Sequence, residues 1–249
     1  IQGTLTLLEV CRNWLQQRNG SRPFRFLQVS TDEVYGDLGA EGRPSKESDV
    51  WHPSSPYAAS KRAGEEAARN AFAGRLTIIR PPAIYGAGDR ETLFIFKLAA
   101  RSFIPLFGPP DGRIAFIHVS DAATSIASIC AMPDIPEKTL FALSGPEPAG
   151  HTRADIFGEA AHLLGKKPRL VTLPDYALQI LASGSALSGR ISGRANMLTP
   201  GKVREILHPD WAIHADEMPP AAIPLPKIAL AEGFALTINW YKKRGWLSS

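Results

Sequence analysis

Apolar positions along the chain recur at two spacings, which predict helices that alternate with strands. Leu5, Leu8, Cys11 and Leu15 repeat at helical spacing, and Gly20 marks the end of this predicted helix. The elements predicted next are a buried strand at 24–29, a helix from 57 to about 72, a strand at 76–79, a helix near 93–101, a strand at 114–119 and a helix from 120 to about 132. Such alternation predicts βαβ units and a parallel sheet.

The pattern changes after Gly145, where the predicted elements become shorter and less regular. They are a helix start at 152–155, a strand at 169–172, more helix from 174, a proline-rich loop crossing the surface at 219–226 and a last amphipathic helix over 229–244. With 249 residues, 44 % of them apolar, the chain can bury a large core and fits one or two domains.

Composition argues against several classes of partner. The net charge of +4 is mild and lacks the interleaved aromatic and basic residues of a nucleic-acid surface. The longest apolar stretch, at 176–187, is too short and too rich in Ser and Gly to span a bilayer, and no signal peptide is visible. Cys11 and Cys130 form no disulfide framework, which favours a reducing, cytoplasmic location, and the six histidines form no metal-ligand set.

The most informative residues are the run from Ser30 to Gly36 and the pair formed by Tyr57 and Lys61. A Tyr and a Lys four residues apart lie on one face of a helix. A free tyrosine has a pKa of ~10, and a nearby ammonium favours its ionised form. Thr31, just after an apolar strand, adds a second group able to hold a substrate oxygen. This set predicts oxidation or reduction of a secondary alcohol; the alternative is a helix on which Tyr57 and Lys61 are surface residues.

Together these motifs resemble the extended short-chain dehydrogenase/reductase family of sugar-nucleotide epimerases and dehydratases. Further matching segments are Gly3-Thr4, Leu7-Leu8-Glu9, Arg80-Pro81, Tyr85-Gly86 and the run from Phe116 to Val119. The resemblance implies an α/β fold: the C-terminal part of a Rossmann-type parallel sheet with helices on both faces, plus a small mixed substrate-binding lobe. It implies a partial dinucleotide-binding domain over 1–143 and mainly the substrate lobe over 144–249. It also implies a homodimer.

By this resemblance, Tyr57 is the base that takes the alcohol proton while hydride passes to NAD, or to NADP. Lys61 would hold the nicotinamide ribose, and Thr31 would bind the same substrate oxygen as Tyr57. The cofactor contacts implied are Ser30, Tyr57, Lys61, Pro82 and Ile84. The implied substrate is a small molecule, a nucleotide sugar.

Asp32 and Glu33 sharpen the resemblance over the first 60 residues, because the family's dTDP-glucose dehydratases carry Thr-Asp-Glu at this place. There the Asp is the acid for the departing hydroxyl and the Glu the base at the neighbouring carbon. Elimination needs one protonated and one ionised carboxyl, and adjacent like charges separate two pKa values. The alternative is that both residues only cap the following loop or helix.

Two positions depart from the pattern of sugar-nucleotide enzymes. Ala83 stands where they carry an Asn, and Ile114 where they carry an Arg for the diphosphate. Arg113 is one place early, which on a strand points its side chain to the opposite face. An epimerase or a hydroxysteroid-type reductase, with Asp32 and Glu33 as bystanders, therefore stays open as an alternative.

The glycine-rich turn that holds a dinucleotide pyrophosphate is not evident. Gly36, Gly39 and Gly42 have a related spacing, but the polar residues after them provide no apolar helix, so we interpret them as a loop. The family places its glycine loop and first strands before Gly3. We therefore expect a truncated sheet whose strand at 24–29 lacks one neighbour, and a non-catalytic fragment is the third alternative.

Overall fold

The structure is a computed structural model that describes residues 1–17, 24–35, 55–132, 140–180, 182–183, 200–208, 210–219 and 223–248. Its centre is a parallel sheet with the strand order β1-β2-β7, formed by β1 (Phe26–Val29), β2 (Leu76–Arg80) and β7 (Leu140–Ala142). In this sheet, β1 lies at the edge and pairs with β2. The predicted parallel sheet is confirmed.

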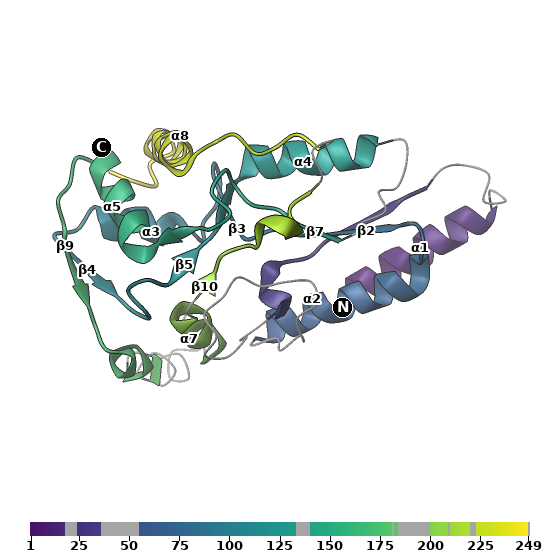
Figure 1. The fold of residues 1–249 in the computed structure, drawn as a ribbon, viewed down its shortest axis with the longest axis horizontal. Helices are drawn as coiled ribbons and strands as arrows, with labels where there is room; N and C mark the ends of the chain where they lie inside the picture. The colour runs from purple at the N-terminus through teal and green to yellow at the C-terminus, as the bar shows by residue number, and fades with distance from the viewer. Residues whose placement is uncertain are drawn as a thin grey trace.

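Helices cover both faces of this sheet, as predicted. α1 (Gln2–Gln17) and α2 (Pro56–Phe72) lie on one face, and α4 (Val119–Ala131) lies on the other (Figure 1). Successive residues of β2 alternate between the two layers: Ile78 packs in the cluster under α1 and α2, and Ile79 packs in the cluster under α4. The central strand is therefore buried on both faces, and all five of its residues are buried.

Most of the other elements form a second region, chiefly in the left half of Figure 1. Its strands are β3 (Ala83–Tyr85), β4 (Phe103–Leu106), β5 (Arg113–Ile114), β6 (Phe116–His118), β8 (His151–Thr152), β9 (Arg169–Thr172) and β10 (Asp210–Trp211). Its helical segments are α3 (Leu93–Ala99), α5 (Arg153–Leu163), α7 (Pro200–Leu207), η3 (Ala215–Glu217) and α8 (Leu230–Lys243). An aromatic cluster around Tyr85 joins α3, α5 and α8 to β6.

Two sequence predictions need correction. The strand expected at 114–119 is interrupted at Ala115, whose N–H donates to Trp211 O at 3.1 Å. β5 thereby joins β8 and β10, whereas β6 pairs with β3. The proline-rich connector does not simply cross the surface, because Ile223 is buried in the cluster under α4.

Local signals fix where the helices start. Ser55 Oγ accepts a hydrogen bond from Ala58 N at 3.0 Å, and Pro56 occupies the first turn of α2. Thr152 and Asp155 form a reciprocal capping box at the start of α5, as their spacing predicts. No helix in the described part of the chain combines the length and apolar character needed to cross a bilayer.

Candidate active site

The predicted catalytic residues meet where β1 ends and α2 begins. Lys61 Nζ donates a hydrogen bond to Val29 O, the last carbonyl of β1, at 3.1 Å. The same ammonium lies 5.8 Å from the centre of the Tyr57 ring. Thr31, two residues after Val29, is buried, and its side chain is near enough to Tyr57 to act on the pKa of that residue through hydrogen bonding. The structure therefore brings Thr31, Tyr57 and Lys61 together, with the Tyr57 side chain 51 % exposed.

Tyr57 has a less acidic hydroxyl than its spacing from Lys61 predicts. Partial burial raises its pKa, and the negative charges of Glu33 and Asp32 raise it further. The hydrogen bond with Thr31 acts in the opposite direction. The pKa of Tyr57 is therefore raised rather than lowered in this structure, because burial and the two carboxylates that the fold places nearby dominate.

Asp32 and Glu33 begin η1 (Asp32–Tyr35), a turn of 3₁₀ helix directly after Thr31. Burial, and secondly the neighbouring Glu33 charge, raise the pKa of Asp32 to about 8. Thr31 Oγ1 lies 3.3 Å from Asp32 Oδ1 and accepts a hydrogen bond from Glu33 N at 3.3 Å. Thr31 therefore satisfies a backbone donor of this turn. Asp32 is protonated at neutral pH, which gives it the form of an acid.

Three further positions were predicted to contact a cofactor. Ser30 is buried directly before Thr31, and its Oγ has no hydrogen-bond partner in the part of the chain that the structure describes. Pro82 is buried, and Ile84 on β3 is exposed. A buried hydroxyl without a partner, beside an anchored ammonium, fits the polar ribose end of a nicotinamide nucleotide.

The glycines after β3 form a turn. Gly86 and Gly88 have φ of 146° and 86°, in the region that favours glycine. A Cβ on Gly86 would lie 2.6 Å from Val119 Cγ1, so the turn packs directly against the start of α4. Gly36, Gly39 and Gly42 lie outside the described residues.

The two positions that depart from sugar-nucleotide enzymes lie in different surroundings. Ala83 is exposed on β3, beside Ile84. Ile114 packs against the aromatic cluster around Tyr85, whereas Arg113 is exposed and its Nη1 donates to Gly150 O at 2.9 Å. Arg113 therefore does not replace an Arg at 114, as the strand periodicity predicts.

His118 caps the start of α4. It is buried, its Nδ1 accepts from Ser120 N at 3.3 Å at the start of α4, and burial lowers its pKa. Among the described residues, no three His, Cys, Asp or Glu side chains are grouped to hold a metal ion. Both cysteines are free.

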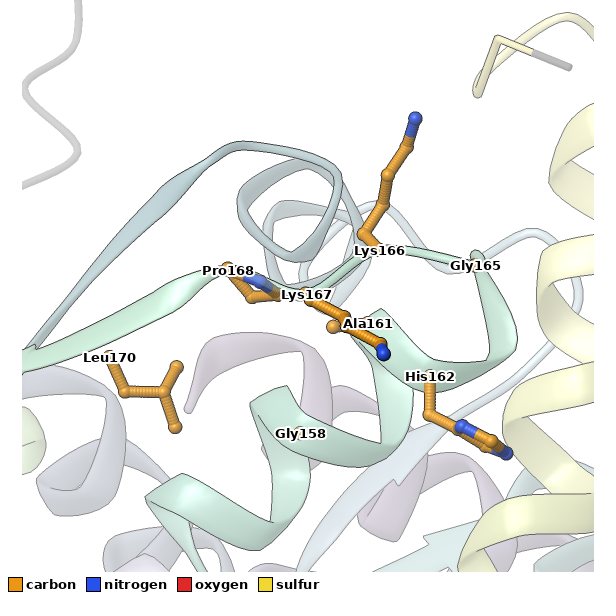
Figure 2. Close-up of a pocket in the computed structure, with 8 residues that line it drawn as sticks. All are labelled: Gly158, Ala161, His162, Gly165, Lys166, Lys167, Pro168 and Leu170. Atoms are coloured by element: carbon orange, nitrogen blue, oxygen red, sulfur yellow. The ribbon is translucent and has the colours of Figure 1, made fainter.

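A surface cavity of about 490 Å³ lies apart from these residues, between the end of α5 and the start of β9 (Figure 2). Its lining comprises Gly158, Ala161, His162, Gly165, Lys166, Lys167, Pro168 and Leu170. His162, Lys166 and Lys167 are exposed, and none of the predicted catalytic residues lines the cavity. Surface cations of this kind are solvated and define no chemistry by themselves.

The sequence did not predict one buried ion pair, one member of which lies on the same helix as Tyr57 and Lys61. Glu65 on α2 and Arg80 at the end of β2 form an ion pair in which both side chains are fully buried. The signal for it is that Glu65 follows Lys61 by four residues and so shares its helix face.

A Tyr and a Lys on α2 and a Thr after β1 therefore meet at one end of a parallel sheet. The sequence profile of the NAD dependent epimerase/dehydratase family matches residues 1–141, and the chain belongs to that family. It is 43 % identical over 196 residues to a ceramide reductase of Caulobacter vibrioides, covering 78 % of this chain and 59 % of that protein. It is 46 % identical over 147 residues to a dTDP-glucose 4,6-dehydratase of Xanthomonas campestris pv. campestris, covering 55 % of this chain and 41 % of that protein.

Solved structures confirm the fold. The dTDP-glucose 4,6-dehydratase of Bacillus anthracis, solved with NAD, superposes with a TM-score of 0.68 at 22 % identity, covering 98 % of this chain and 67 % of that one. The UDP-glucose 4-epimerase of Thermus thermophilus, also solved with NAD, superposes with a TM-score of 0.66 at 20 % identity, covering 99 % and 70 %. The chain spans less than two thirds of the length of the curated relatives described above.

Proposed function

We propose that this chain carries the catalytic centre of an NAD-dependent oxidoreductase that moves a hydride between the nicotinamide and the carbon of a secondary alcohol or ketone. The observation that supports this most strongly is the grouping of Thr31, Tyr57 and Lys61 at the end of β1. Tyr57 is exposed enough to meet a substrate, and Lys61 is fixed by a backbone carbonyl.

Each residue then has one task. Tyr57 Oη takes the hydroxyl proton when the alcohol is oxidised and returns it when the ketone is reduced. Lys61 places a positive charge beside the phenolate, and Thr31 Oγ1 donates to the substrate oxygen. When NAD, or NADP, is bound, its nicotinamide accepts or supplies the hydride. Ser30, Pro82 and Ile84, with Tyr57 and Lys61, would hold the nicotinamide and its ribose.

The first candidate reaction is dehydration of a nucleotide sugar, as performed by dTDP-glucose 4,6-dehydratases. The raised pKa of Asp32 favours it, because a carboxyl protonated at neutral pH can give its proton to a departing hydroxyl. Glu33, the next residue, would remove the proton from the neighbouring carbon. Transient oxidation by the Tyr57 centre makes that proton acidic enough to leave.

The second candidate is reduction of a long-chain ketone of the ceramide class. It is favoured by the ceramide reductase, which matches 78 % of this chain, against 55 % for the Xanthomonas dehydratase. Ala83 and Ile114, where a nucleotide sugar would need polar partners, also suit an apolar substrate. In this reaction Asp32 and Glu33 are bystanders.

We further propose the division into residues 1–143, with the dinucleotide-binding part, and residues 144–249, mainly a substrate lobe. A homodimer and a cytoplasmic location also belong to the proposal. The two free cysteines are compatible with a reducing compartment.

The reactions are separated by assaying the purified protein with dTDP-glucose and with a long-chain ketone of the ceramide class, each with NAD(H) and NADP(H). A dehydratase carrying both Asp32→Asn and Glu33→Gln loses elimination but keeps hydride transfer. A reductase carrying the same changes keeps its turnover. Hydride transfer that is unaffected by Tyr57→Phe contradicts the proposed catalytic centre.

The non-catalytic alternative is tested by calorimetric titration of NAD onto the 249-residue chain, beside a version extended upstream. Binding by either form supports the proposal, and binding by the short chain shows that the cofactor is held without a glycine-rich turn. A folded protein in which neither form binds NAD or NADP contradicts it.

A further inference from the structure

The buried side of α2 is built mainly from small residues. Ala58, Gly64 and Ala68 are buried on it, with Phe72 at its end, and a Cβ on Gly64 would lie 3.6 Å from Thr4 Oγ1 of α1. Small side chains interlock little, so apolar packing alone leaves the rotation of a helix about its axis weakly specified. Glu65 is buried on the same helix, although a carboxylate is costly to remove from water.

Arg80 forms a bidentate ion pair with the Glu65 carboxylate. Its Nε donates to Glu65 Oε1 at 3.0 Å and its Nη2 donates to Glu65 Oε2 at 2.7 Å. Burial alone would lower the pKa of Arg80, but the hydrogen bonds and charges of Glu65 and Tyr35 outweigh burial and raise that pKa. A bidentate contact of this kind is directional as well as strong.

Tyr35 connects this ion pair with η1, the turn that carries Asp32 and Glu33. The Tyr35 ring lies 4.6 Å from the central carbon of the Arg80 guanidinium. Tyr35 is buried and is the last residue of η1, the turn that begins with Asp32. Glu65, Arg80 and Tyr35, called here the buried cluster, therefore connect α2 and β2 with η1.

We propose that Glu65 and Arg80 are positioning residues that fix the rotation of α2, so that Tyr57 and Lys61 face Thr31. Tyr57, Lys61 and Glu65 follow one another at intervals of four and so share one helix face. Any rotation that breaks the two-point contact therefore moves Tyr57 and Lys61 in the same direction. This inference rests on the proposed function.

Stability alone is a weak reason for the pair. Replacing a buried ion pair with apolar side chains of similar volume is often neutral or stabilising, whereas removing one member leaves a buried charge unpaired. A double variant that is apolar at both positions therefore separates stability from positioning. The directional constraint is lost, while the layer between α2 and β2 stays filled.

The test compares Glu65→Leu/Arg80→Met with a matched control on the same helix, Glu66→Gln. The control breaks the exposed pair of Arg62 with Glu66, whose Nε–Oε1 distance is 3.0 Å. Four quantities are measured for each protein: the thermal midpoint, kcat and KM for hydride transfer, and the pKa of Tyr57. The last is obtained from ultraviolet titration as the difference between each protein and its Tyr57→Phe version.

We expect the double variant to keep a cooperative thermal transition and to lose about tenfold to a hundredfold in kcat, the size of effect produced by misplacing reacting groups by about 1 Å. KM should change by less than about twofold, and the pKa of Tyr57 should rise because Lys61 is held less closely. Glu66→Gln should match the wild type throughout.

A double variant that folds with the kcat and the Tyr57 pKa of the wild type overturns the proposal. If that variant does not fold, Arg80→Lys is measured in the same way. This variant keeps the positive charge but loses the planar guanidinium that makes the two-point contact. If the wild type transfers no hydride, the proposed function fails, and the Tyr57 titration alone still decides whether the pair positions the helix.

Discussion

Two tyrosines show how differently the two regions of this molecule use the same side chain. Tyr57, in the first turn of α2, is 51 % exposed, whereas Tyr85, at the end of β3, is 2 % exposed. Burial is the main cause that raises the pKa of both hydroxyls. Around Tyr57 the neighbours are charged or polar; around Tyr85 they are the rings of Phe116, His118 and Phe234, with centroids at 5.7, 5.4 and 5.3 Å.

The surroundings, rather than the residue, decide which tyrosine can do chemistry. Tyr57 meets solvent and lies beside Lys61, whose ammonium is fixed on the carbonyl of Val29. Ionisation of Tyr57 is therefore accessible at moderate cost once a further positive charge arrives. Tyr85 has neither access nor a cation beside it among its described ring contacts, so its hydroxyl stays protonated and its ring stabilises the core.

The largest expected effect tests this contrast directly. Tyr57→Phe should lower hydride transfer by about 10²–10⁴-fold, the range for loss of a general acid–base group, and leave the free energy of unfolding within about 0.5 kcal/mol. Tyr85→Phe should leave kcat within about twofold. Steady-state kinetics and urea unfolding of both variants check the prediction, and equal loss of activity in the two would contradict it.

The next effect concerns the packing over Tyr85. A Cβ added at Gly233 on α8 would run into the Tyr85 hydroxyl, and the fully packed ring cannot withdraw. Gly233→Ala should therefore destabilise the protein by about 1–3 kcal/mol, as overpacking of a core does. Adding Tyr85→Phe should recover part of that loss in a double-mutant cycle, and purely additive changes in the free energy of unfolding would show that the two groups do not meet.

A smaller effect is expected at Asp32, whose pKa is raised from the ordinary 3.8 to about 8. The folded state keeps a proton that the unfolded state releases, so this group makes the protein less stable as the pH rises from about 4 to about 8. Asp32→Asn should therefore raise the thermal midpoint by several degrees at pH 8 and by little at pH 4. A gain of the same size at both values would contradict the raised pKa.

The pH dependence of catalysis also tests the raised pKa of Asp32. If Asp32 is the acid of a dehydration, elimination should slow as the pH rises through about 8, because the proton it must give is lost. Ketone reduction should continue across that range, since Tyr57 stays protonated there. Parallel pH profiles of the two reactions provide the measurement.

The catalytic region was largely predictable because its signals are local. The period of α1, the start of α2 at Pro56 and the spacing of Tyr57 and Lys61 all lie within one or two helical turns. The three-residue strands β3 and β7 were not predicted, because so few residues show no period. The division between β5 and β6 was also not predicted. It depends on the pairing of β5 with β10, which lies about a hundred residues further along the chain.

Electrostatic detail was harder to predict than the site itself. The sequence places Lys61 near Tyr57 through helix geometry, but the approach of Asp32 and Glu33 to Tyr57 depends on how η1 packs beside α2. The expected direction of the Tyr57 pKa was therefore wrong for this structure. The pair formed by Glu65 and Arg80 is hidden likewise, because its members lie on different elements.

The most direct test of the central claim is to follow deuterium between the nicotinamide C4 and the substrate carbon in wild type and Tyr57→Phe. The account predicts that deuterium from labelled cofactor, or from a labelled alcohol, crosses to the other partner in the wild type. It also predicts that the variant slows this transfer by about 10²-fold or more. Product formed without deuterium transfer, or at an equal rate in Tyr57→Phe, would contradict the assignment of Thr31, Tyr57 and Lys61 as the catalytic centre.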